Sequence, residues 1–434
     1  MLGCMAEHEH AFPWFPLAAT DATSDRATIT LGLRSADLHF REQVVPGIGR
    51  VWFLRQLCWP VAALALRPDL PPDGRPGRTA ADIASGIEAL ACKLEFIEGE
   101  GSDSKRIIGV RAFTRDQGQN GASIWDYDSL RTRAHYVQNT YRQAAVRALG
   151  EHAGLGLASG SRYSSMVLTG PGEQLAQAYL SQSAGKPPLK NWLLRWIAGA
   201  DGYRGPSVRL ALSPEHASDD EREIIWKRLA GVDTPGSEKR RALAKIFLQE
   251  ETFPDIEKSL LPALREQGKK EALQASGIAL ARSFGALFTA ALRVLAHLTR
   301  LIEQVGAVLP ADAAARKEIR RAMEQLSESA QKYHKQHEKL PAVGHADALR
   351  FALGVQARSG GELLSWLVSL DGQILQLSDG ELHPGSLFRV LDNEEDATDQ
   401  DGTTDLDART DDGRTFRLVN LFSLVKDCGM DAVP

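Results

Sequence analysis

Two histidines and an acid in the C-terminal half of the sequence have the types and the spacing of metal ligands. His334, His337 and Glu338 form the pattern H-x-x-H-E on a predicted helix, and His345 and Asp347 follow it. Side chains three positions apart share one face of a helix, so two imidazoles there could bind one zinc ion. The pattern is neither H-E-x-x-H nor H-x-x-E-H, and its surroundings, YHKQHEK, are highly charged. We therefore expect an exposed helix surface here and no metal site.

A second candidate for chemistry is Asp103-Ser104-Lys105, which precedes the apolar run IIGV and is similar to one half of a metal-dependent nuclease core. Its surroundings have the composition of an ordinary loop. The sequence contains no phosphate-binding G-x-x-x-x-G-K-[ST] loop and no G-x-S-x-G nucleophile elbow. We expect no catalytic residue, no cofactor and no metal. A nuclease whose site is assembled from scattered acids stays the alternative.

The candidate binding residues are five arginines and one glutamine in a single stretch, namely Arg131, Arg133, Arg142, Gln143, Arg147 and Arg162. Arg142, Gln143 and Arg147 fall on one side of a predicted helix and would face the groove of a DNA duplex. Arg131 and Arg133 would contact phosphates, which position a protein on DNA without specifying a sequence. The alternative is that these arginines only solvate an amphipathic helix.

The elements that must position these residues lie between Tyr141 and Leu180, YRQAAVRALGEHAGLGLASGSRYSSMVLTGPGEQLAQAYL. The pattern predicts a helix, two short strands joined by a tip, and a second helix that begins Leu-Thr-x-x-Gly. The predicted bounds are 142–149 for the first helix, 154–157 for the hinge and first strand, 159–162 for the tip, 163–168 for the second strand, and 168 for the start of the second helix.

From about residue 130 to residue 180 this stretch resembles the winged-helix superfamily, with the first helix as recognition helix and the tip as wing. The resemblance implies a module that contacts DNA or protein. The wing departs from a strongly basic pattern because it carries only Arg162. Many winged helices pack against protein instead of DNA, so both kinds of partner stay open.

Composition and charge limit the class of protein. The chain has 434 residues, of which 43% are hydrophobic and 25% charged, as in a globular protein of several modules. With a net charge of −5, it can bind nucleic acid only through a local basic face. Its four cysteines are far apart, which predicts reduced thiols. The most apolar run, 51–66, is interrupted by Arg55 and Pro60, and the start does not resemble a signal peptide. We expect a cytoplasmic protein with no membrane contact.

The predicted fold class is mainly α, because apolar residues recur at helical spacing along most of the chain. Over 256–370 this spacing predicts a helical bundle in which six residues are buried together, namely Leu295, Leu298, Met323, Leu326, Phe351 and Leu367. Strands are expected at 28–33 and 106–113. The turn pairs Asp371-Gly372 and Asp379-Gly380 predict a small hairpin, and 414–427 predicts a strand followed by a short helix.

These elements divide the chain into modules. The predicted modules are a loose tail at 1–25, a mixed α/β region at 26–125, a winged-helix-like module at 126–185, a helical connector at 186–255, the helical bundle at 256–370, and a small α+β end at 371–434 with an acidic loop at 392–412. The acidic loop should be mobile because its charges repel one another.

Three blocks of the sequence, VPGIGRVWFLRQLCWPVAALAL, the segment from YRQAAVRAL to LTGPG, and FRLVNLFSLVKD, resemble scattered blocks in uncharacterised proteins of bacterial defence islands and mobile elements. Such proteins tend to be accessory partners of helicases or nucleases. The resemblance implies a non-enzymatic DNA-binding or scaffold subunit of an antiviral (anti-phage) defence or mobile-element complex. Its partners would be double-stranded DNA and helicase or nuclease subunits. A pure protein-interaction subunit is the further alternative beside the nuclease.

Overall fold

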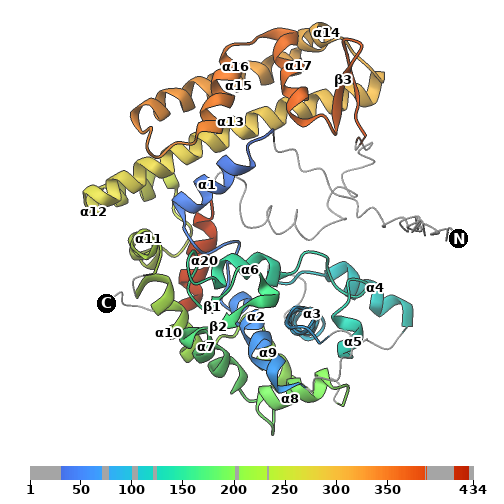
Figure 1. Ribbon diagram of the computed structural model, residues 1–434, viewed down its shortest axis with the longest axis vertical. Helices are drawn as coiled ribbons and strands as arrows, with labels where there is room; N and C mark the ends of the chain where they lie inside the picture. Colours follow the sequence, from blue (N-terminus) through green and yellow to red (C-terminus); the bar gives the residue numbers. More distant parts are fainter. Residues whose placement is uncertain are drawn as a thin grey trace, which may run out of the picture.

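The computed structural model describes residues 31–70, 78–99, 106–120, 125–200, 205–231, 234–386, 388 and 415–429. Within these residues helices predominate and the named strands form two short antiparallel hairpins, which confirms the mainly α fold class. In Figure 1 the segment 269–384 forms the upper part of the molecule, and most of the segment 55–226 forms the lower part.

The upper part is built on α13 (Lys269–Val305), a helix of 37 residues that packs along α15 (Lys317–Lys339). Apolar side chains recur every three or four positions on both helices, and their removal from water stabilises the contact. The neighbouring helices are α12 (Leu261–Gln267), α14 (Pro310–Ala315), α16 (Ala346–Gln356) and α17 (Gly360–Asp371). The six residues predicted to share a core, from Leu295 to Leu367, are all buried, which confirms the predicted helical bundle.

A hairpin follows α17 directly. Strand β3 (Leu375–Ser378) pairs with β4 (Glu381–Pro384), with Ser378 opposite Glu381 next to the turn. Asp379 and Gly380 both have positive φ, +51° and +82°, as a two-residue turn of this hand requires. The predicted hairpin is therefore confirmed, and its second strand also bridges Val308 through Leu382, which ties it to the end of α13.

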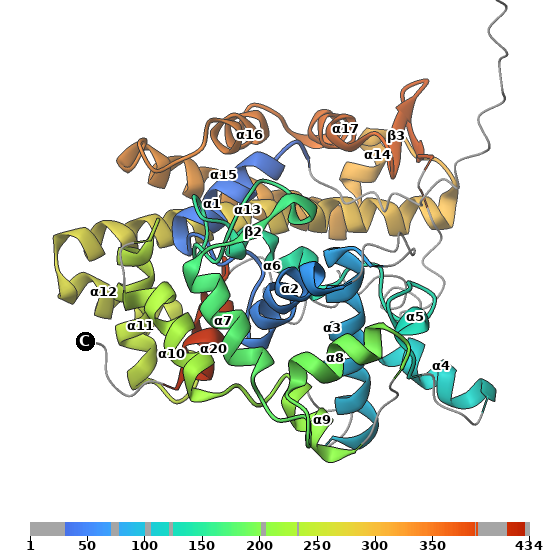
Figure 2. The same ribbon diagram turned by 60° about the horizontal axis from the view of Figure 1, so that its bottom comes forward.

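The lower part surrounds α2 (Arg55–Leu66), most of whose residues are buried. Figure 2 shows the neighbours of this helix, of which α3 (Ala80–Glu98), α6 (Tyr141–Leu149) and α7 (Gly170–Leu180) pack against it most extensively. The outer helices are α4 (Val110–Asn120), α5 (Tyr127–Leu130), α8 (Leu189–Ile197), α9 (Pro206–Leu212) and α10 (Asp219–Trp226). Single turns of other helix types are η1 (Arg67–Asp69), η2 (Tyr163–Ser165), η3 (Lys227–Gly231) and η4 (Ile256–Leu260).

Three helices connect the two parts, namely α1 (Arg34–Val44), α11 (Ser237–Gln249) and α20 (Leu418–Cys428). α1 packs against α13 and α16, whereas α20 packs against α10 and α11. Phe40 of α1 contacts Phe284 of α13 and Phe416, with ring centroids 4.8 and 6.4 Å apart. Phe416, which precedes α20, is thus connected to α13 through the ring of Phe40.

The order of elements predicted for the winged-helix-like module is present. α6 is followed by strand β1 (Ala158–Ser159), η2, strand β2 (Val167–Leu168) and α7. Position 172 in the Leu-Thr-x-x-Gly pattern requires glycine for a steric reason, because a Cβ there would lie 1.9 Å from the carbonyl oxygen of Leu157. The strands are shorter than predicted, since η2 takes the place of the start of the second strand. The relationship to the winged-helix superfamily stays a prediction.

The N-terminal region differs from the prediction. Its described residues between 31 and 120 contain helices and no strand, so the mixed α/β assignment of 26–125 is wrong there. Residues 31–33 of the predicted strand 28–33 form the turn before α1. In the predicted strand 106–113, residues 106–109 form a loop and residues 110–113 begin α4. The strand predicted within 414–427 is likewise a turn before α20. The tail 1–25 and the acidic loop 392–412 lie outside the described residues.

One helix among the described residues, α13, is long and apolar enough to cross a membrane by length and composition. Of its most apolar window, 61% is buried inside the protein. The helix is the core of the upper part, and its hydrophobicity is explained by packing, as in a soluble protein. The cysteines Cys58, Cys92 and Cys428 are buried and form no disulfide.

A fully buried arginine holds the lower part together. Arg55 begins α2 and donates hydrogen bonds to the carbonyl oxygen of Ala211 at 2.6 Å, to that of His216, and to the side chain of Gln182 at 3.1 Å. Its guanidinium also lies 3.2 Å from a carboxylate oxygen of the equally buried Glu221. Because a buried charge is costly unless it is paired and hydrogen-bonded, these contacts must form together.

We expect the substitution Arg55→Met to lower the free energy of unfolding by about 3–5 kcal/mol, because it leaves the Glu221 carboxylate buried without its counter-charge. Urea denaturation followed by circular dichroism measures the change. The control is Lys227→Met, which removes an exposed ion pair with Glu223 and should cost about 1 kcal/mol or less. Equal losses in the two variants would contradict the role given to Arg55.

Candidate nucleic-acid interface

The N-terminus of α6, the predicted recognition helix, lies against a buried acid of α3. The carboxylate of Glu88 accepts the backbone N–H of Tyr141 at 2.7 Å and that of Arg142 at 3.0 Å. It also accepts the hydroxyl of Tyr136 at 2.8 Å. These are N–H groups that a helix leaves unpaired at its first turn, and a negative charge there also favours the helix dipole. The first turn of α6 is therefore occupied from within the protein.

Burial raises the pKa of Glu88 to about 7, against the lowering effect of the hydrogen bonds from Tyr141, Tyr136 and Arg142. Desolvation disfavours the charged carboxylate, whereas the three donors favour it. The balance leaves a carboxyl group that changes its charge near neutral pH although it has no contact with solvent.

The three residues predicted to face a DNA groove each have a partner within the protein, although Gln143 and Arg147 are exposed. The guanidinium of Arg142 lies over the ring of Tyr163, 5.2 Å from its centroid. The Gln143 side chain accepts the backbone N–H of Thr140 at 3.2 Å and so closes a capping box on its own helix. Arg147 pairs with Glu42 of α1 at 2.8 Å.

Of the three remaining predicted residues, one forms ion pairs and two are exposed. Arg131 lies 3.2 Å from Asp128 and 4.0 Å from Asp82 of α3. Arg133 and Arg162 are exposed. Four of the six predicted side chains thus have a partner within the protein, and a role of this set in nucleic-acid binding stays a prediction.

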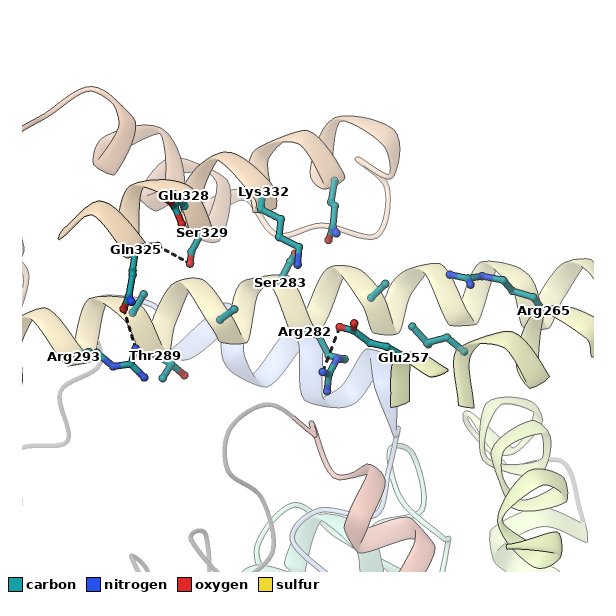
Figure 3. Close-up of a pocket in the computed structure, with 15 residues that line it drawn as sticks. Glu257, Arg265, Arg282, Ser283, Thr289, Arg293, Gln325, Glu328, Ser329 and Lys332 are labelled. Carbon is teal, nitrogen blue, oxygen red and sulfur yellow. Dashed lines mark hydrogen bonds and ion pairs between the residues drawn. The ribbon is translucent and has the colours of Figure 1, made fainter. Parts of the chain in front are cut away.

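A different basic surface lies on the upper part. It is a trough of about 640 Å³ on the exposed face of α13, bounded by α15, α12 and η4 (Figure 3). Arg265, Arg282, Arg293 and Lys332 bring four positive charges to it, and Glu257 and Glu328 bring two negative ones. We call this surface the α13–α15 trough. Its net charge is about +2, whereas the net charge of −5 of the whole chain comes from the segment 392–412, which holds ten acidic residues and one Arg.

Helical periodicity produces the trough. Along α13 the lining positions Ala279, Ser283, Ala286 and Ala290 fall on one face and carry small side chains, which leave the space above them open. Arg282 and Arg293 are 11 residues apart, about three turns, so both extend from the same side of the helix.

Two of the four cationic side chains of the trough, Arg282 and Arg293, are held by polar neighbours. Arg293 donates to the side-chain oxygen of Gln325 at 3.0 Å across the two helices, and Arg282 lies 3.5 Å from Glu257 (Figure 3). Lys332 extends from α15 toward α13 in the same view. Ser283 and Ser329 add hydroxyl groups to the lining. Such a surface can bind an anion by charge and by hydrogen bonds from its donors.

Sequence reasoning missed this surface because α13 and α15 were interpreted only as core helices. A signal was present in the sequence of α13, where Arg282 and Arg293 are separated by about three whole turns on a side of the helix that otherwise carries mostly alanine and serine. Such spacing indicates a basic face. What the sequence does not contain is the register in which the two helices face each other, and that register brings Gln325 to Arg293.

The histidine pattern lies at the turn between α15 and α16. His334 contacts the Gln356 side chain at 3.4 Å, and the His345 ring accepts the backbone N–H of Asp347 at 3.2 Å and so caps α16. Burial lowers the pKa of His337, with His334 adding to the effect, and burial and His39 lower the pKa of His345. Among the residues that the structure describes, no three His, Cys, Asp or Glu side chains gather as metal ligands. Asp103-Ser104-Lys105 lies outside the described residues.

Comparison of the chain with protein-family models, with curated proteins and with solved structures finds no match in any of the three. The function must therefore be inferred from the charges, contacts and shape of the protein itself.

Glu88 gives a test of how α6 is fixed. Its folded-state pKa of about 7 lies above the ordinary value of 4.5 for a glutamate, so the protonated form is favoured by folding and its contribution is complete below about pH 4.5. As the pH rises toward 7, the wild type should lose up to about 3 kcal/mol of unfolding free energy relative to Glu88→Gln. Chemical denaturation of both proteins between pH 5 and pH 8 measures this difference. The exposed Glu151→Gln is the control, and parallel pH profiles for wild type and Glu88→Gln would contradict the prediction.

Proposed function

We propose that this protein is a non-enzymatic nucleic-acid-binding protein whose binding surface is the α13–α15 trough. The observation that carries the proposal is the set of four cationic side chains, against two glutamates, on one open face of the protein. Phosphate binding depends on clustered Lys and Arg, and net charge does not exclude it where a basic face exists.

The lining of the trough supports phosphate contacts in two further ways. Ser, Thr and Gln side chains lie beside the cations, and side chains of these types make many of the contacts to phosphate and sugar oxygens. The arginines are also anchored, Arg293 by Gln325 and Arg282 by Glu257, so less side-chain freedom is lost when an anion binds.

In this proposal the lower part serves as a scaffold within a larger cytoplasmic complex, such as the antiviral defence or mobile-element assembly that the sequence blocks resemble. Helicase or nuclease subunits would supply the chemistry. A metal-dependent nuclease would need a cluster of carboxylates that binds the metal, and the described residues contain no such cluster.

A second candidate function, protein interaction, is favoured by one specific feature of the winged-helix-like module. An open groove of about 690 Å³ lies between β2, α7 and the end of α2. Its lining is mostly apolar and includes Leu64, Met166, Leu168 and Leu180. Val167 at its edge is 67% exposed, the highest value among the large exposed hydrophobic residues of the described chain. Exposed apolar surface of this kind is typical of a contact with a partner protein.

The trough is tested by fluorescence anisotropy with labelled nucleic acid over a salt series. Neutralising a phosphate contact should lower the slope of log K against log salt by about 0.9, so Arg293→Ala and Lys332→Ala should each reduce both affinity and slope. Lys245→Ala is the matched control, since this exposed lysine lies on α11 outside the trough. Variants with the affinity and slope of the wild type would overturn the proposal.

The groove beside β2 is tested separately by capture of partner proteins from the native cell. Val167→Lys places a charge at the edge of the groove and should abolish capture of proteins that the wild type retains, because an unpaired charge in an apolar contact is costly. Leu377→Lys is the control, since Leu377 is a 46% exposed apolar residue on the other hairpin. Mass spectrometry compares the three captures. Identical captures for wild type and Val167→Lys would refute a role of this groove.

A further inference from the structure

We infer that the α13–α15 trough holds a nucleic-acid duplex by its phosphate backbone and reads no base sequence. This inference rests on the proposed function and specifies its ligand. It is carried by three properties of the trough, which are the chemistry of its lining, the rigidity of its cationic row and the width of the helix pair that forms it.

The lining provides nothing on which bases could stack. None of the 15 residues that line the trough is aromatic. Proteins that bind single strands without sequence preference combine a basic groove with aromatic rings that stack on the bases. The aromatic residues of this part of α13 belong to the core instead, since Phe284 is buried against Phe40 and Tyr333, with ring centroids 4.8 and 6.2 Å away. Unstacked bases would therefore gain little here.

The cationic row has a fixed length. Arg282 and Arg293 are separated by 11 residues of continuous helix, which is about 16 Å along the axis. This distance equals the rise of about five base pairs of B-DNA. A duplex also holds its phosphates at fixed positions. Its binding to the arginines of α13 therefore costs less conformational entropy than the binding of a flexible single strand, which must first be ordered.

The width of the helix pair excludes base reading. Two packed helices have axes 8–10 Å apart, and each helix with its side chains is about 10–12 Å across, which gives a pair about 20 Å wide. The major groove of B-DNA is about 12 Å wide and admits a single helix. Because both α13 and α15 border the trough, the pair must lie across the backbone, where contacts position the duplex without specifying its sequence.

The test compares three ligands of roughly 20 nucleotides per strand, longer than the row of cations, at low salt, namely two duplexes of unrelated sequence and one single strand. We expect the two duplexes to bind with equal affinity within about twofold and the single strand about tenfold more weakly. The double variant Arg293→Glu with Lys332→Glu should lose the binding of both duplexes. The matched control, Lys245→Glu with Arg320→Glu, reverses two exposed charges outside the trough and should keep it. Thermal unfolding of each variant establishes that the protein is folded.

The outcomes separate the two proposals. A single strand that binds as tightly as the duplexes, with the same loss in the double variant, would overturn the duplex inference and leave the proposed function in place. A difference of more than about tenfold between the two duplexes would overturn backbone-only contact, because phosphate contacts carry no sequence information. No binding of any of the three ligands at low salt would overturn both.

Discussion

The buried guanidinium of Arg55 is the constraint on which the lower part of the protein depends. α2 is enclosed on nearly every side, so the charge at its start cannot reach water. Its acceptors are Gln182 after α7, Ala211 at the end of α9, His216 between α9 and α10, and Glu221 at the start of α10. The chain from α7 to α10 must therefore pass around the start of α2.

Other buried charges follow the same rule. Glu88 of α3 accepts the first N–H groups of α6, and Lys93 of the same helix pairs with Asp116 of α4 at 3.2 Å. The buried Arg240 donates to backbone oxygens of Leu229, Pro46 and Pro235. Each of these groups would be costly if it were left alone, and each joins segments that are far apart in the sequence. Charges in the interior thus specify which helices meet, whereas apolar burial supplies most of the stability.

The sequence predicts the parts of this fold that depend on local signals. Apolar spacing located α13, α15 and their neighbours, and Asp379-Gly380 located the hairpin, because both signals lie within a few residues of the element they specify. The run around Ile107 and Ile108 was predicted as a strand. Both residues are buried, as their type requires, but they lie in the loop that enters α4. A short apolar run indicates burial and does not by itself determine backbone conformation.

The candidate interface was less predictable, since it depends on contacts between distant residues. Nothing near Arg147 in the sequence indicates that Glu42 will pair with it. Likewise, the trough exists only because α13 and α15 lie side by side in one register, which places Gln325 beside Arg293. The sequence therefore shows where arginines occur, whereas the packing of the helices determines which of them can contact a ligand.

The uneven distribution of charge, with ten acidic residues in 392–412 and four cations in the trough, also governs how a nucleic acid would arrive. At a net charge of −5 the protein as a whole repels a polyanion at long range, and at physiological ionic strength this repulsion is screened beyond about 8 Å. At close range the trough, with four cations against two glutamates, offers attraction. Because the trough lies on a helix that the core already holds rigid, no conformational step delays capture. In the proposed binding mode, this local attraction would orient an approaching duplex toward α13.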